Sequence, residues 1–251
     1  MISVLMVGES WTSVTSHYKG FDFFTGVTHE ETGADYFREA VLKDPAIKYE
    51  FMPSHIAAED FPTDIEELRK YDVIILSDIG ANTLLLSRKV FIEGKTQPNR
   101  LKLIRQWVLE GGALCMCGGY LSFAGMEAKA KYFRTPIEEI LPVNIYTFDD
   151  RVEAPEGVAV VVKNADHPIL SGVKGEWPAL LGYQETMLKP EADAIAVTET
   201  GDPLIAAWEF GKGRTMVWTT DVGPHWCPTP FAEWEGYGQI WRNAMHWLAN
   251  K

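Results

Sequence analysis

Short apolar runs alternate with amphipathic segments along the first half of the chain. Segments 2–7, 47–52 and 71–78 predict strands, and the middle of the third is apolar throughout, as in a buried parallel strand. Segments 30–42 and 100–110 carry apolar residues at helical spacing and predict helices. This alternation favours a doubly wound, mostly parallel sheet with right-handed crossovers and helices on both faces.

Two segments between these elements differ from them in their pattern of residues. Residues 10–28 are rich in Ser, Thr, Gly and aromatic side chains, and we expect a long loop that serves packing or function. Thr63 and Glu66 have the spacing of a capping box, which predicts a short helix that ends at Lys70.

A fourth apolar run, residues 113–117, ends abruptly in Gly118 and Gly119. This pattern predicts a buried strand that turns sharply into a helix, with Gly118 at the tip of the turn. In open α/β folds such a turn lies at the carboxyl edge of the sheet, where ligands bind. The sequence therefore predicts a site at this elbow.

The second half of the chain is richer in short strands. Strands are predicted at 158–163, 193–198, 204–210 and 215–220, with a hairpin turn at 209–214 and a final amphipathic helix at 237–250. We expect this part to be a strand-rich C-terminal elaboration of the α/β fold. No internal repeat or low-complexity linker interrupts the chain, so residues 1–251 are expected to form one domain.

Composition narrows the function classes. A formal net charge of −12 argues against a nucleic-acid surface and an anionic membrane, and no apolar run approaches the length of a membrane span. Three cysteines without framework spacing, and a start that lacks a secretion signal, predict a cytoplasmic protein. No metal-ligand spacing is found among His17, His29, His55, His167 and His246, so no metal is expected. No glycine-rich nucleotide motif occurs, so no cofactor is expected. The expected partners are a small molecule and further copies of the chain.

The candidate chemistry lies where the predicted strands end. One hypothesis is an enzyme in which Cys117 is the nucleophile, His225 its base and either Asp221 or Glu233 the acidic group that orients the base. The competing interpretation places Cys117 in the core, because it is the last strand residue if Gly118 is the tip, and buried cysteine behaves as a small hydrophobe.

The second hypothesis is a binding pocket without a working nucleophile. Backbone N–H groups at Gly118, Gly119 and Tyr120 would hold an anionic or carbonyl oxygen at a helix N-terminus. Polar contacts would come from the ends of other strands, and tryptophans would form walls. The residues assigned to these contacts are Glu9, Ser10, Asp78, Asp221 and His225, with Trp11 and Trp226 as walls.

The chain resembles the class I glutamine amidotransferase-like superfamily, and within it a group of bacterial GATase1-like proteins of unknown function. The stretches that carry the resemblance are residues 111–123, 149–152, 164–168, 182–183 and 221–226. The resemblance implies a flavodoxin-like α/β sandwich. True amidotransferases of this superfamily carry a Gly-x-Cys-x-Gly elbow and a later His-x-Glu pair.

This sequence departs from both motifs. Its elbow reads Met116-Cys117-Gly118-Gly119-Tyr120, and His225 is followed by Trp226 and Cys227. We therefore expect the fold without the Cys-His-Glu triad, and a small polar metabolite bound at the carboxyl edge of the sheet. Two alternatives stay open: a hydrolase or glutamine amidotransferase that uses Cys117 and His225, and a carbohydrate-related or self-associating interaction module.

Overall fold

The computed structural model describes residues 1–31 and 33–251. The strands are β1 (Ile2–Gly8), β2 (Trp11–Lys19), β3 (Asp22–Glu30), β4 (Ile47–Met52), β5 (Val73–Ser77), β6 (Ala113–Cys117), β7 (Val143–Asn144), β8 (Arg151–Val158), β9 (Val160–Val162), β10 (Leu180–Gln184), β11 (Met187–Leu188), β12 (Asp193–Thr198), β13 (Pro203–Phe210) and β14 (Gly213–Trp218). The helices are α1 (Asp35–Val41), α2 (Ser54–Asp60), α3 (Ile65–Leu68), α4 (Ala81–Leu85), α5 (Arg88–Phe91), α6 (Arg100–Leu109), α7 (Pro136–Ile140), α8 (Thr229–Ala232) and α9 (Glu235–Ala249), with short 3₁₀ turns at Met126–Ala128 and Pro168–Leu170.

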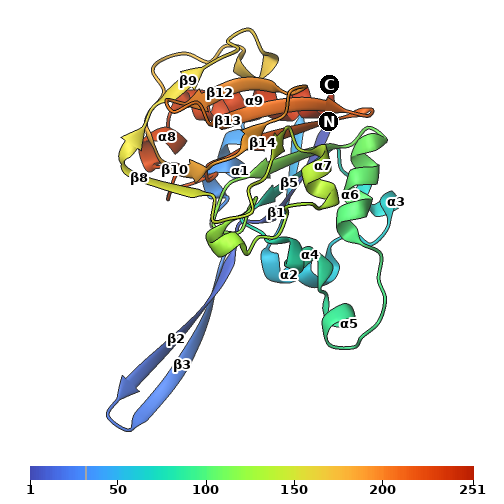
Figure 1. Cartoon of the computed structure of the whole chain (residues 1–251), viewed down its shortest axis with the longest axis vertical. Coiled ribbons are helices and arrows are strands. Elements are labelled where there is room, and N and C mark those ends of the chain that lie inside the picture. The colour runs from blue at the N-terminus through green and yellow to red at the C-terminus, as the bar shows by residue number, and fades with distance from the viewer. Residues whose placement is uncertain (32) are drawn as a thin grey trace.

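One large sheet organises the molecule (Figure 1). Its strand order is β4-β1-β5-β6-β14-β13-β12-β9. Strands β4, β1, β5, β6 and β14 run parallel, and β13, β12 and β9 continue the sheet in antiparallel pairs. The structure thus confirms an α/β fold around a mixed, mostly parallel sheet.

Two apolar layers cover the two faces of this sheet. On one face, Phe37 of α1 and Trp241 of α9 join a core with alternate residues of the strands. On the other face, Leu68, Ile104 and Ile140 bring α3, α6 and α7 into a second core. Because both faces are buried, the central strands are apolar on both sides, which explains the continuous apolar runs of the sequence. No helix in the described ranges is long and apolar enough to span a membrane.

Most predicted elements of the sheet are confirmed. Strand β4 has the predicted bounds, β5 and β6 lie within their predicted runs, and the turn between β13 and β14 is a hairpin. Helix α1 begins at Asp35, later than the predicted start at Glu30, which instead ends β3. The predicted helix 63–70 is shorter, and Asp64 rather than Thr63 caps it by accepting the N–H of Glu67 at 2.9 Å.

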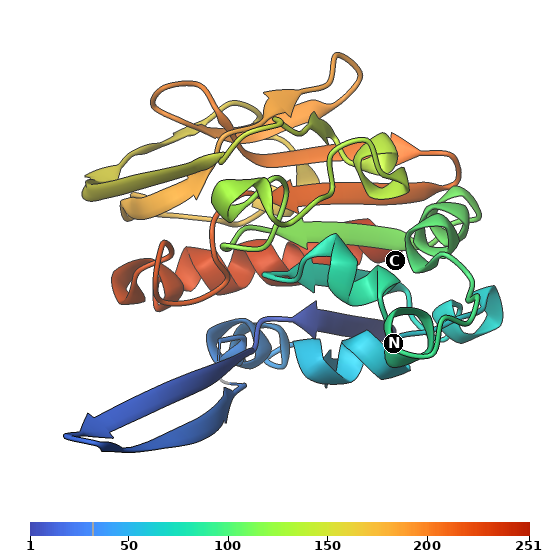
Figure 2. The ribbon, with the colours of Figure 1, turned by 60° about the horizontal axis from the view of Figure 1, so that its bottom comes forward.

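The predicted loop at 10–28 is wrong. Strands β2 and β3 pair along nine residues each and form a two-stranded hairpin that projects away from the sheet (Figures 1 and 2). We call residues 11–30 the arm. Alternating Thr, Val, Ser and aromatic residues are typical of strands. The prediction failed because the Ser and Gly residues in this segment also suggest a loop.

The predicted helix after the elbow is also wrong. Strand β6 is followed by irregular backbone and a single 3₁₀ turn. Phe123 and Gly125 adopt positive φ angles of 53° and 72°, which a helix does not tolerate. The buried carboxylate of Asp150 holds this loop by accepting the N–H groups of Ala124 and Gly125 at 2.9 and 2.8 Å. The backbone donors of the segment are therefore satisfied by a side chain from elsewhere instead of by helical bonds.

Candidate functional site

Four neighbouring parallel strands end at the same edge of the sheet. Glu9 follows β1, Asp78 follows β5, Gly118 follows β6, and the loop with Asp221 and His225 follows β14. Strand β1 pairs with β4 on one side and β5 on the other, so the chain order reverses there. A crevice at such a reversal is where open α/β sheets bind ligands.

Glu9 lies in an unusual environment for a carboxyl group. It has a positive φ of 44°, only 8% of its surface is exposed, and it accepts the Ser77 hydroxyl at 2.5 Å. Burial, together with the nearby charges of Asp78 and Asp221, raises its pKa to about 8. Glu9 is therefore protonated at neutral pH.

Asp78 mirrors Glu9 at the end of the next strand. It also has a φ of 44°, and its carboxylate accepts the N–H of Leu121 at 2.6 Å. Burial raises its pKa to about 6, although the hydrogen bond from Leu121 opposes the shift. Two strained non-glycine residues at adjacent strand ends are typical of functional sites, because the fold must stabilise them against their conformational cost.

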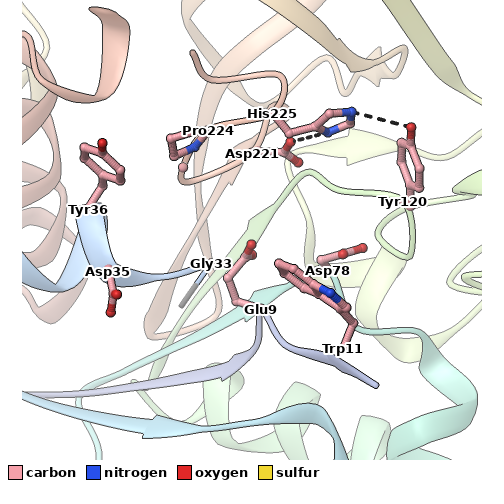
Figure 3. A pocket seen from close by; sticks show the side chains of 11 residues that line it. Glu9, Trp11, Gly33, Asp35, Tyr36, Asp78, Tyr120, Asp221, Pro224 and His225 are labelled. Atoms are coloured by element: carbon pink, nitrogen blue, oxygen red, sulfur yellow. Dashed lines mark hydrogen bonds and ion pairs between the residues drawn. The ribbon is translucent and has the colours of Figure 1, made fainter. Parts of the chain in front are cut away.

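Asp221 and His225 form a hydrogen-bonded pair. The Asp221 carboxylate lies 2.8 Å from Nδ1 of His225 and also accepts the Trp226 N–H at 2.9 Å. Nε2 of His225 faces the Tyr120 hydroxyl at 3.4 Å (Figure 3). The hydrogen bond with Asp221 raises the pKa of His225. This arrangement leaves Nε2 directed toward Tyr120, available for proton exchange with a ligand.

These side chains surround one open cavity of about 700 Å³ (Figure 3). Its volume is typical of a small-molecule site. The lining residues are Glu9, Trp11, Gly33, Asp35, Tyr36, Asp78, Tyr120, Asp221, Gly223, Pro224 and His225. No lysine or arginine is among these described lining residues, so the cavity presents an acidic surface.

Six of the residues singled out in the sequence line this cavity, and five do not. Ser10 belongs to a smaller neighbouring pocket, where its hydroxyl accepts the N–H of Ser54 at 2.7 Å. Trp226 is buried behind His225, with the two rings stacked 5.3 Å apart, and therefore supports the histidine instead of forming a wall. Gly118, Gly119 and Cys117 are also outside the lining.

Sequence reasoning missed the contribution of helix α1 and the segment before it. Gly33, Asp35 and Tyr36 line the cavity, and a Cβ at Gly33 would lie 2.7 Å from Oε1 of Glu9. The sequence carries no signal for this proximity, because an aspartate in the first turn of a helix is ordinary.

One of the three N–H groups predicted to form an anion cradle, that of Gly118, is not free to bind a ligand. The N–H of Gly118 donates to the carbonyl oxygens of Trp218 and Thr220 at 2.7 and 2.9 Å, so it is already used. Gly119, not Gly118, has the strained backbone, with a φ of 126°. A Cβ at Gly119 would lie 2.6 Å from Cβ of Asp78. The space into which a side chain at the tip would project is thus occupied by Asp78.

Cys117 is fully buried in the face of the sheet covered by α1 and α9. Its Sγ lies 3.9 Å from that of Cys115, two residues earlier on the same face of β6. Burial raises its pKa well above the ordinary value, so the reactive thiolate is suppressed. All three cysteines of the chain are free and buried.

The GATase1_like family model, which is described as putative glutamine amidotransferase, matches residues 3–250. The chain belongs to this family. Two solved structures are similar to this GATase1-like chain in both sequence and fold. It is 40% identical to the cytoplasmic protein STM3548 from Salmonella typhimurium, with a TM-score of 0.92 and 98% of each chain covered. It is 41% identical to the cytoplasmic protein STM1381 from Salmonella typhimurium LT2, with a TM-score of 0.91 and coverage of 98% and 99%.

A more distant solved structure is similar to this GATase1-like chain in fold but not in sequence. A putative ThuA-like protein from Bacteroides uniformis is 12% identical, with a TM-score of 0.57 and coverage of 98% of this chain and 91% of that one. No curated protein matches the chain at a significant level. Within residues 1–31 and 33–251, no group of three or more His, Cys, Asp or Glu side chains is placed to hold a metal ion.

Replacing Asp221 with asparagine is expected to lower the pKa of His225 toward its ordinary value, because the hydrogen bond to Asp221 is the main cause of the raised pKa. Titration of the His225 ring by NMR measures this shift. Glu153→Gln is the matched control, since Glu153 contributes only a weaker charge interaction. An unchanged pKa in Asp221→Asn would show that the contact at Nδ1 does not control His225.

Proposed function

We propose that this GATase1-like chain is a cytoplasmic protein, built on a flavodoxin-like scaffold, that binds a small metabolite rich in hydrogen-bond donors. The ligand occupies the cavity at the carboxyl edge of the sheet. It carries a protonated amine or several hydroxyl groups. Cysteine chemistry plays no part in its binding.

The observation that carries this proposal is the acidic lining of the cavity. Asp78 and Asp221 face it from two strand ends and Asp35 from helix α1, beside the neutral acid of Glu9. Ionised carboxylates only accept hydrogen bonds, so they pair with amines and hydroxyls and repel phosphates and carboxylates. A site for an anion is usually built with cations, and no lysine or arginine is among the described lining residues.

Differences in protonation give the cavity more than one kind of contact. Glu9, with a pKa of about 8, is a neutral acid at pH 7 that both donates and accepts hydrogen bonds. His225, whose pKa is raised by the hydrogen bond to Asp221, supplies a ring nitrogen that can donate or accept a hydrogen bond according to its protonation. A set of carboxylates, one neutral acid and one histidine suits the mixed donors and acceptors of a polyol or an amino alcohol.

Two aromatic side chains add flat apolar surface to the same cavity. Trp11 is about half exposed at the start of the arm, and Tyr120 packs edge-on against His225 with ring centroids 5.1 Å apart. Aromatic faces stack on the C–H faces of sugars and attract ammonium groups. These walls support the same ligand class as the carboxylates.

The buried thiol favours this proposal over the hydrolase or amidotransferase alternative. Cys117 is outside the cavity lining, whereas His225 is part of it. A nucleophile must be within hydrogen-bond reach of its base and open to substrate. Burial also suppresses the thiolate that would attack.

The test is a binding screen by calorimetry with monosaccharides, linear polyols, primary amines and amino alcohols, against phosphate and dicarboxylates as the anionic set. At least one donor-rich ligand is expected to bind, and Asp78→Asn should weaken it by roughly 10-fold or more through the loss of a charge-assisted hydrogen bond. Cys117→Ala is the control variant and should bind with unchanged affinity. Binding confined to the anions, or lost in Cys117→Ala alone, would contradict the proposal.

A further inference from the structure

The arm is the most unusual surface of the molecule. It projects from the body as an isolated two-stranded ribbon (Figures 1 and 2), and none of its residues from Trp11 to Glu30 is buried. A two-stranded hairpin has little stability of its own in water, because it has no layer to pack against. A hairpin of this length therefore needs a partner for one of its faces.

The pairing of β2 with β3 gives the arm two different faces. Directly opposed residues lie on the same face, so Val14 with Val27 and Tyr18 with Phe23 form one apolar face. Each of these four side chains is more than half exposed, and the rings of Tyr18 and Phe23 stack with centroids 5.9 Å apart. We call these four residues the apolar face of the arm.

The opposite face carries all the charges of the arm. Lys19 pairs with Asp22 near the tip, and Glu30 lies opposite Trp11 at the base. The same face also holds the half-exposed rings of Trp11 and Phe24. Because every charge lies on the opposite face, the apolar face is the one that a partner can cover without burying a charge.

Charge favours a second copy of this chain as the cover. The whole chain has a formal net charge of −12, whereas the three charges of the arm nearly cancel. Two copies that approach through their bodies repel one another, but two arms meet with little repulsion. A surface with few charges and several aromatic rings also matches the composition of interface cores.

The size of the surface fits a stable dimer. A standard interface buries about 800 Å² on each partner, and a buried aromatic side chain contributes about 150–250 Å². Tyr18 and Phe23 on the apolar face, with the fully exposed Phe21 at the tip, therefore supply roughly 450–750 Å², more than half of the area required. Val14, Val27 and the adjoining backbone extend the same surface.

We propose that the arm is a dimerisation element, through which two copies of this chain pack the apolar faces of their arms against each other across a two-fold axis. Such a contact is self-complementary, because each arm offers the same face that it needs covered. The arm begins at Trp11, which lines the acidic cavity, so the dimer fixes a wall of that site as well.

The experiment compares two matched double variants by sedimentation equilibrium. The wild type is expected to have twice the mass of one chain. Tyr18→Ser/Phe23→Ser removes the apolar face and should weaken the dimer by roughly 100-fold, as for the loss of an interface hot spot. His17→Ser/Phe24→Ser removes the neighbouring ring pair from the opposite face and should leave the dimer intact. Circular dichroism checks that both variants are folded.

A crosslinking measurement distinguishes the two faces directly. Ser16→Cys places a thiol midway along the apolar face, Thr15→Cys places one on the charged face, and the native cysteines are buried. Mild oxidation should link two chains of Ser16→Cys only. A monomeric wild type, or a dimer that survives Tyr18→Ser/Phe23→Ser, would overturn the proposal. A monomer whose arm binds lipid vesicles or a different protein would do so too.

Discussion

Gly119→Cys is expected to destabilise the protein by about 3 kcal/mol without creating a nucleophile. The φ of 126° at Gly119 is strained for any side chain, and the new Cβ would lie 2.6 Å from Cβ of Asp78. Denaturant unfolding measures the change in the free energy of unfolding. Release of ammonia from glutamine should stay at background in both the wild type and the variant.

Gly111→Cys is the matched control for this change. Gly111 has a similar φ of 121°, but the nearest atom to its ideal Cβ is 3.9 Å away, so it measures the backbone strain without the collision. It should cost about 1 kcal/mol. Adding Asp78→Ala to Gly119→Cys should restore part of the lost stability, because the colliding carboxyl group is removed. A stable Gly119→Cys protein that hydrolyses glutamine would refute this view of the elbow.

The sequence predicts the sheet well because burial on both faces leaves continuous apolar runs. Strands β5 and β6 were found in this way, whereas the edge strand β4 was found by its alternating apolar and polar residues. The carboxyl-edge geometry then follows from the parallel order, and it brings Glu9, Asp78 and the loop after β14 together around one cavity. These inferences need only local pattern and chain order.

The two wrong elements share a different physical cause. The arm has no core to face, so its apolar residues are interleaved with Thr, Ser and Gly and resemble a loop. The segment after β6 is fixed by Asp150, which accepts the N–H groups of Ala124 and Gly125 from a distant position in the chain. Single-sequence patterns carry no information on such long-range hydrogen bonds, and for the same reason they missed Gly33 and Tyr36 in the cavity.

Glu9→Gln is expected to flatten the dependence of stability on pH. The pKa of Glu9 is raised in the folded state from 4.5 to about 8, so the folded protein binds this proton more tightly than the unfolded chain does. That contribution to stability is complete below pH 4.5 and is lost as the pH rises to about 8. The wild type should therefore lose about 2 kcal/mol or more of unfolding free energy between pH 5 and pH 8.

In Glu9→Gln this part of the loss disappears, because the amide stays neutral and its oxygen still accepts the Ser77 hydroxyl. Asp78 and Asp150, with pKa values raised to about 6, leave a smaller slope of the same sign. Denaturant unfolding of wild type and variant at several pH values between 5 and 8 measures both slopes. Glu199→Gln, at an exposed position, is the control and should keep the wild-type slope. If wild type and Glu9→Gln lose stability equally over this range, Glu9 is ionised in the folded protein, and its neutral-acid role in the cavity is excluded.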